Sequence, residues 1–125
     1  MGDYKTLIVW QLANELRRDT LLLLRRSVFA QDWALRKEGR KTLGQICRRI
    51  PEGYKRHTHA EFAQFLQYSL GSVGELRDFF DEVQERKFLT PRDLHGPRQL
   101  CYRLDIALTR FVRYLRGNDP PPGWV

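Results

Sequence analysis

Apolar and polar positions alternate with the period of an α-helix in four long segments of this chain. Each segment repeats apolar or small residues in steps of three and four, the spacing of one helix face and not of a strand. In the first segment, about residues 4–29, the stripe runs through Val9, Ala13, Leu16, Thr20 and Leu23. In the second, about residues 32–50, it runs through Leu35, Gly39, Leu43, Ile46 and Ile50.

The third and fourth segments each begin with a helix-start signal. Thr58 and Glu61 have the spacing of a capping box. The third stripe follows them through Phe62, Leu66, Ser69, Val73, Leu76, Phe80 and Val83. The fourth segment opens at Thr90-Pro91, an N-cap followed by proline at the first helical position. Its stripe runs through Cys101, Leu104, Leu108, Phe111 and Leu115, and Gly117 is a typical helix end.

Prolines stand only at positions 51, 91, 97 and 120–122, so they separate the segments without interrupting most of their length. Four helices with one apolar stripe each predict an all-α fold, an antiparallel up-down-up-down four-helix bundle. We expect residues 1–117 to form this bundle, and residues 118–125, with three successive prolines, to form an extended or disordered tail.

Composition indicates one globular domain, because 125 residues with 42% hydrophobic side chains suffice for a core. The longest stretch without a charged residue, 62–74, is too short to span a membrane. The N-terminus shows no signal-peptide pattern. Two cysteines without CxxC spacing, Cys47 and Cys101, favour a reducing compartment. We therefore expect a cytoplasmic protein with no membrane segment.

Positive charge is concentrated in the first half of the chain. Residues 1–58 hold 13 basic and 6 acidic side chains, whereas residues 59–89 hold 3 basic and 6 acidic ones. On the second segment Lys37, Lys41 and Arg48 lie opposite the apolar stripe around Gly44, where a missing side chain would let a phosphate backbone approach closely. The candidate nucleic-acid-binding residues are Arg17, Arg18, Arg25, Arg26, Arg36, Lys37, Arg40, Lys41, Arg48, Arg49, Lys55 and Arg56.

Two interpretations of these basic stripes stay open. They are either solvated faces of the bundle or a surface that binds RNA or DNA through phosphate contacts, for which arginine is well suited. The third segment carries the opposite charge on its outer face, at Glu75, Asp78, Glu82 and Glu85. The sequence contains no zinc-finger, helix-turn-helix or RNP pattern, so we expect little base-specific recognition.

Several large apolar residues lie off the stripes. Trp10, Leu21, Tyr68 and Phe79 are the candidates for an oligomer interface, and Trp33 stands near the start of the second segment. Either they pack under loops and the tail, or they form a contact between copies, since exposed apolar patches commonly mark interfaces.

No catalytic or metal site can be assembled from the sequence. His57 and His59 flank Thr58 without further ligands at zinc spacing, and the cysteines fall on or beside core stripes. None of the three serines lies in a nucleophile elbow, and no glycine-rich phosphate loop is present. We expect no enzyme activity, metal or cofactor; a small hydrolase is the remaining alternative.

Two blocks of residues resemble a known family. Residues 7–13 match the opening pattern L-x-V-W-Q-x-A, and residues 52–76 match E-G-[FY], E-F-x-x-F-L and L-G-S-x-x-E-L in order. This pattern is similar to that of the four-helix-bundle family first named for the protein encoded in 23S ribosomal RNA intervening sequences. The chain departs from the family between residues 45 and 53, where Arg49 replaces the usual asparagine and Pro51 is shifted.

The resemblance implies a pentameric ring of four-helix bundles without enzyme activity. This family is similar to the accessory variability determinant of diversity-generating retroelements, and residues 42–45 look like a stretch common in those accessory proteins. The resemblance to these accessory proteins implies that the chain binds RNA or DNA and also binds a reverse transcriptase. The leading hypothesis is therefore a basic, nucleic-acid-binding accessory protein, and the alternative is a protein-interaction bundle without a nucleic-acid role.

Overall fold

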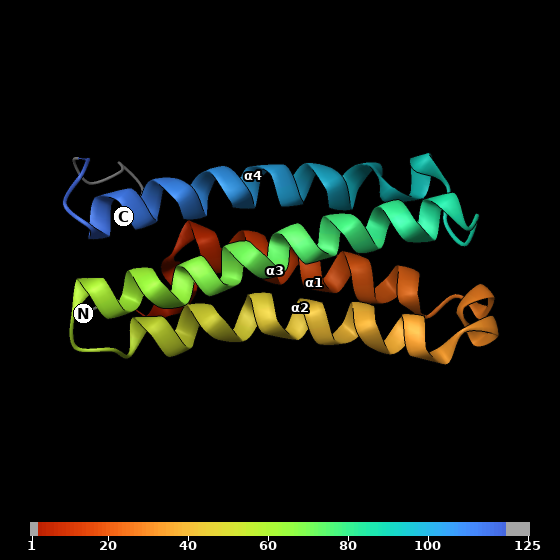
Figure 1. The fold of residues 1–125 in the computed structure, drawn as a ribbon, viewed down its shortest axis with the longest axis horizontal. Helices are drawn as coiled ribbons and strands as arrows, with labels where there is room; N and C mark the ends of the chain where they lie inside the picture. Colours follow the sequence, from red (N-terminus) through yellow and green to blue (C-terminus); the bar gives the residue numbers. More distant parts are fainter. Residues whose placement is uncertain (1–2, 120–125) are drawn as a thin grey trace.

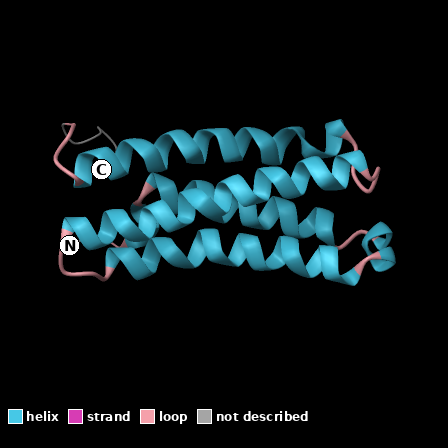
Figure 2. Cartoon of the chain, viewed as in Figure 1, coloured by secondary structure: helices cyan, strands magenta, loops and turns pink. Residues whose placement is uncertain are grey.

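The four apolar stripes become four helices in the computed structural model, which describes residues 3–119 of the chain. They are α1 (Ile8–Leu24), α2 (Trp33–Tyr54), α3 (His59–Glu85) and α4 (Pro91–Leu115). Two short 3-10 helices, η1 (Tyr4–Thr6) and η2 (Ser27–Gln31), flank α1. Residues 3–119 contain no β-strand, and Figure 2 shows helices joined by short loops.

Successive helices run in opposite directions and form a four-helix bundle (Figure 1). Helices α1 and α3 each pack against both α2 and α4, so helices adjacent in the chain are neighbours in space. The turn between α2 and α3 lies at the end of the bundle where α1 begins and α4 finishes. The all-α prediction is confirmed. None of the helices in the described part of the chain is long and apolar enough to span a membrane.

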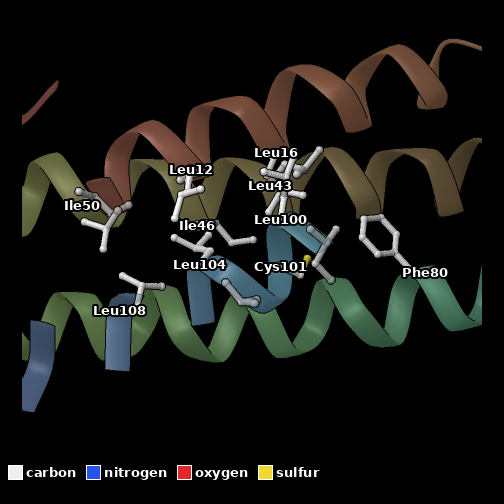
Figure 3. Packing of buried hydrophobic residues seen from close by; sticks show 14 of the residues in the cluster. Leu12, Leu16, Leu43, Ile46, Ile50, Phe80, Leu100, Cys101, Leu104 and Leu108 are labelled. Carbon is white, nitrogen blue, oxygen red and sulfur yellow. The ribbon is translucent and has the colours of Figure 1, made fainter. Parts of the chain in front are cut away.

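The core contains nearly every position of the four predicted stripes. Figure 3 shows side chains such as Leu16, Ile46 and Leu104 pointing into one interior from different helices. Polar stripe members are accommodated as well: the Ser69 hydroxyl donates a hydrogen bond to the Ile46 carbonyl at 3.0 Å, which joins α3 to α2. At the ends of the stripes Leu23 and Phe62 are only half-buried.

Phe79 lies in this core, which corrects the expectation that it lies off the stripes at an interface. Its side chain is only 3% exposed. The ring packs where α2 has no side chain, because a Cβ atom on Gly39 would lie only 2.6 Å from the Phe79 Cζ atom. A glycine on the facing helix therefore makes room for a second phenylalanine beside Phe80.

Two helix ends differ from the expected ones. The first segment is shorter as an α-helix, because η1 and η2 account for its two ends. Helix α2 continues through Pro51 to Tyr54, although a proline was expected to end it. Pro51 removes one backbone donor, yet the last turn still closes, with the Lys55 amide donating to the Pro51 carbonyl at 3.3 Å.

The predicted caps are confirmed at α3 and α4. Thr58 caps α3 by accepting from the Glu61 amide at 3.1 Å, but the Glu61 carboxylate accepts from the Thr58 hydroxyl and not from its amide, so the capping box expected there is half formed. Thr90 and Asp93 form a full capping box, in which each side chain accepts from the backbone amide of the other. Gly117 ends α4 with a φ of 80°, a left-handed conformation that glycine adopts without strain. Residues 120–125 of the expected tail lie outside the described residues.

Two capping carboxylates predict an acid-sensitive fold. The Thr90 amide, helped by the Arg26 guanidinium, lowers the pKa of Asp93. Asp32 caps α2 by accepting from the Leu35 amide at 2.9 Å, and this hydrogen bond, helped by Arg86, lowers the pKa of Asp32 in the same way. Their stabilisation is complete above the ordinary aspartate pKa and is lost as the pH falls through the lower folded value. Thermal unfolding monitored by circular dichroism will show a midpoint that falls below about pH 4.

The control for this prediction is the double variant Asp32→Asn and Asp93→Asn. Its unfolding midpoint will be lower at neutral pH. The midpoint will also fall by fewer degrees on acidification, because these two carboxylates no longer titrate. If the wild type and the double variant lose the same number of degrees in acid, the two carboxylates are not the groups responsible.

Candidate nucleic-acid interface

The basic residues of α1 and α2 come together because these two helices are neighbours. The Cys47 thiol on α2 donates a hydrogen bond to the Ala13 carbonyl on α1 at 3.4 Å. Burial raises the pKa of Cys47 to about 11, and the positive charges of Arg17 and Arg48 oppose that rise. Both guanidinium groups therefore lie near this thiol, at the seam between α1 and α2.

A row of cations follows the outer side of α2. Lys37, Lys41, Arg48 and Lys55 are exposed, and their steps of four and seven place them opposite the buried stripe. On α1, Arg18 and Arg25 are exposed one heptad apart. Arg40 is exposed on α2 seven residues before Cys47, which contacts α1, so helical spacing places Arg40 toward the same side. We call this surface the basic face; it consists of Arg17, Arg18, Arg25, Lys37, Arg40, Lys41, Arg48 and Lys55.

The basic face is not paired with carboxylates in the part of the chain that the structure describes. Among residues 3–119, none of its members forms an ion pair with a carboxylate. Arg17 makes a hydrogen bond to the neutral Asn14 side chain at 2.9 Å. The seam and the outer row of α2 therefore form a surface of uncompensated positive charge.

Gly44 does not provide the open approach that the sequence suggested. A Cβ atom there would lie 2.8 Å from the Nη1 atom of Arg48, so the guanidinium of Arg48 covers the glycine. Any phosphate at this position meets Arg48 first and not the backbone of α2.

The other four predicted basic residues each contact another side chain of the bundle. Arg26 points to α4 and pairs with Asp93 at 2.9 Å. Arg49 pairs with Glu52 of the same helix at 3.7 Å, and its guanidinium lies 5.3 Å from the centre of the Tyr68 ring on α3. Arg56 covers the Phe65 ring at 4.4 Å, and Arg36 covers the Trp33 ring at 5.0 Å. Within residues 3–119, these four side chains differ from the members of the basic face in pairing with a carboxylate or lying over an aromatic ring, and their role in binding stays a prediction.

The candidate interface residues are exposed to different extents. Trp10 and Leu21 are half-buried and pack against the core, and the Trp10 ring meets the Tyr4 ring edge-on at 5.8 Å. Tyr68 is 47% exposed and Trp33 is 62% exposed. Sequence reasoning missed Tyr102, which is 59% exposed on α4. Helical spacing was the available signal, because it places Tyr102 away from the stripe of Cys101, Leu104 and Leu108.

A pocket of about 620 Å³ opens at the end of the bundle where α2 turns into α3. We call it the end pocket. Its walls carry the rings of Tyr54, Phe62, Phe111 and Tyr114, and the turn residues 55–59 border it. Sequence reasoning did not find this site, because it considered His57 and His59 only as metal ligands. The available signal was the recurrence of aromatic residues beside three helix ends.

The cysteine and histidine side chains of the described residues lie in different environments. Burial raises the pKa of Cys101 to about 12, so its thiol is protonated at neutral pH. His57 and His59 are exposed. Residues 3–119 contain no cluster of three or more histidine, cysteine or acidic side chains that could hold a metal ion.

Comparison with known proteins gives one assignment. The family model of the 23S rRNA-intervening sequence proteins matches residues 5–110, which is most of the chain. No curated protein matches the chain.

Proposed function

The chain belongs to the 23S rRNA-intervening sequence protein family, and from this premise we propose that it binds the phosphate backbone of RNA or DNA without catalysing a reaction. The observation that carries the proposal is the basic face. Lys37, Lys41 and Arg48 follow one side of α2, and no carboxylate in residues 3–119 pairs with them. A surface of unpaired cations attracts a chain of phosphates electrostatically.

The geometry favours backbone binding over base recognition. The basic face lies on the sides of two packed helices, and its cations follow the helix axis over many turns. Binding to such a surface is driven by the release of condensed counterions and depends little on sequence. Arginines at the seam add bidentate contacts to phosphate oxygens.

The proposal includes a ring of several copies. The outer side of α3 is acidic, with Glu75, Asp78 and Glu85 exposed and without ion pairs among the described residues. A basic and an acidic face on one subunit favour head-to-tail association, which closes into a ring when the rotation permits. The subunit number of five comes from the family resemblance. A ring would repeat the basic face, so that weak contacts add through avidity.

Assistance to a reverse transcriptase is part of this proposal. It is supported by the resemblance to the accessory variability determinant of diversity-generating retroelements, which includes residues 42–45. A basic ring would hold template or product nucleic acid close to such an enzyme. The place of the gene next to a reverse transcriptase would distinguish this role from that of other intervening-sequence proteins.

A second candidate function is a protein-interaction bundle. The exposed rings of Trp33, Tyr68 and Tyr102 favour it, because aromatic side chains are enriched at protein interfaces. In that case the basic face is only solvated, and the exposed aromatic side chains contact the partner protein.

Purified protein will separate the two candidate functions. We expect light scattering to give a mass several times the 14.9 kDa of one chain. We also expect the ratio of absorbance at 260 nm to that at 280 nm to fall after nuclease treatment and a high-salt wash, because co-purified nucleic acid is removed. A monomeric mass would contradict the ring. A ratio that nuclease does not change would favour the interaction bundle.

A further inference from the structure

The end pocket combines aromatic walls with a positively charged border. The rings of Tyr54 and Phe62 meet edge-on at 6.0 Å, and those of Phe62 and Phe111 at 5.2 Å. Phe111 and Tyr114 stack with an interplanar angle of 29°, and the Tyr114 ring lies 5.9 Å from that of His59. The pocket is therefore lined by flat side chains that are held in place by one another.

The volume and openness of this pocket suit a flat ring system. A space of about 620 Å³ lies in the usual range for small-molecule sites. Tyr114 is half-buried, so part of its ring is accessible. Aromatic side chains bind nucleobases by stacking, whatever the base, because every base has a π-face.

The border of the pocket is continuous with the basic face. Lys55 belongs to both, since it follows Arg48 by seven residues on the outer row of α2 and also lines the pocket. The row from Lys37 to Lys55 extends over about 27 Å of helix. A phosphate chain that follows this row reaches the mouth of the pocket, where Arg56 and His57 supply further donors.

We propose that the end pocket binds an unpaired base of the nucleic acid whose backbone lies on the basic face. This inference rests on the proposed function and specifies its ligand as single-stranded RNA or DNA. A base inside a duplex is stacked and paired, so it could enter the pocket only after unpairing at a cost in free energy. An unpaired base enters freely and gains the stacking contact.

The test compares a single strand of about 20 nucleotides with a duplex of the same sequence. The variant Tyr114→Leu keeps an apolar side chain but removes the stacking ring. We expect it to weaken single-strand binding by about 5-fold to 150-fold, the range measured for the loss of one stacked base, and to leave duplex binding unchanged. The matched control is His95→Leu, which removes an exposed ring on the same helix outside the pocket and will change neither affinity.

A second measurement does not depend on folding of the variant. In a single strand that carries the fluorescent base 2-aminopurine, stacking in the pocket of the wild-type protein will quench the emission on binding. Wild-type protein that binds single strands without quenching, with Tyr114→Leu binding equally well, would overturn the pocket proposal and leave the proposed function intact. Absence of binding to both the single strand and the duplex would instead refute the proposed function itself.

Discussion

Replacing Lys37, Lys41 and Arg48 with glutamate will weaken nucleic-acid binding roughly 100-fold or more at ~50 mM salt, for every sequence tested. Each substitution removes one of the attractions that release counterions and adds like-charge repulsion against a phosphate. The helices will remain folded, because all three side chains are exposed on the outer row of α2. Fluorescence anisotropy with several unrelated labelled oligonucleotides measures the loss.

The control for this variant carries the same change in net charge at another place. Lys5, Lys87 and Arg92 are exposed and lie outside the basic face, and their replacement by glutamate alters the total charge equally. If binding depends on the basic face, this control will retain most of its affinity. Equal weakening in both triple variants would show that only net charge matters.

Truncating the core of α3 will have the largest effect on stability. Leu66 and Leu76 are completely buried on the third stripe. Leu66→Ala or Leu76→Ala will lower the free energy of unfolding by ~2–5 kcal/mol each, because the variant loses apolar contacts and leaves a cavity. Urea denaturation followed by circular dichroism measures this change.

Leu22→Ala is the matched control for these core variants. Leu22 is 62% exposed on α1, so its truncation will change the free energy of unfolding by no more than about 0.5 kcal/mol. Losses of similar size at Leu22 and at both buried positions would mean that the third stripe does not form the core.

The helical stripes could be predicted because each residue's face follows from its position alone. The stripe of α2 from Leu35 to Ile50 is buried throughout, and Thr58 and Thr90 cap the helices that they were expected to cap. Phe79 could not be placed in the same way. Its burial depends on Gly39 of a neighbouring helix, and that contact is a property of the packed bundle.

The candidate site was predictable only in part. The row of Lys37, Lys41 and Arg48 follows from helical spacing, and the structure shows all three exposed. The sequence could not show that Arg26 forms an ion pair with Asp93 on α4, since the two residues come into contact only after folding. The end pocket was missed for the same reason, because its rings come from residues as distant in sequence as Tyr54 and Tyr114.

The dependence of wild-type affinity on salt tests the central claim most directly. If the basic face binds a phosphate backbone, the logarithm of the association constant for a duplex will fall linearly with the logarithm of salt concentration, by roughly 0.9 per phosphate contacted. The variant with glutamate at positions 37, 41 and 48 will show a slope smaller by about three. No binding by the wild-type assembly at ~50 mM salt, or a slope that this variant leaves unchanged, would contradict the proposal.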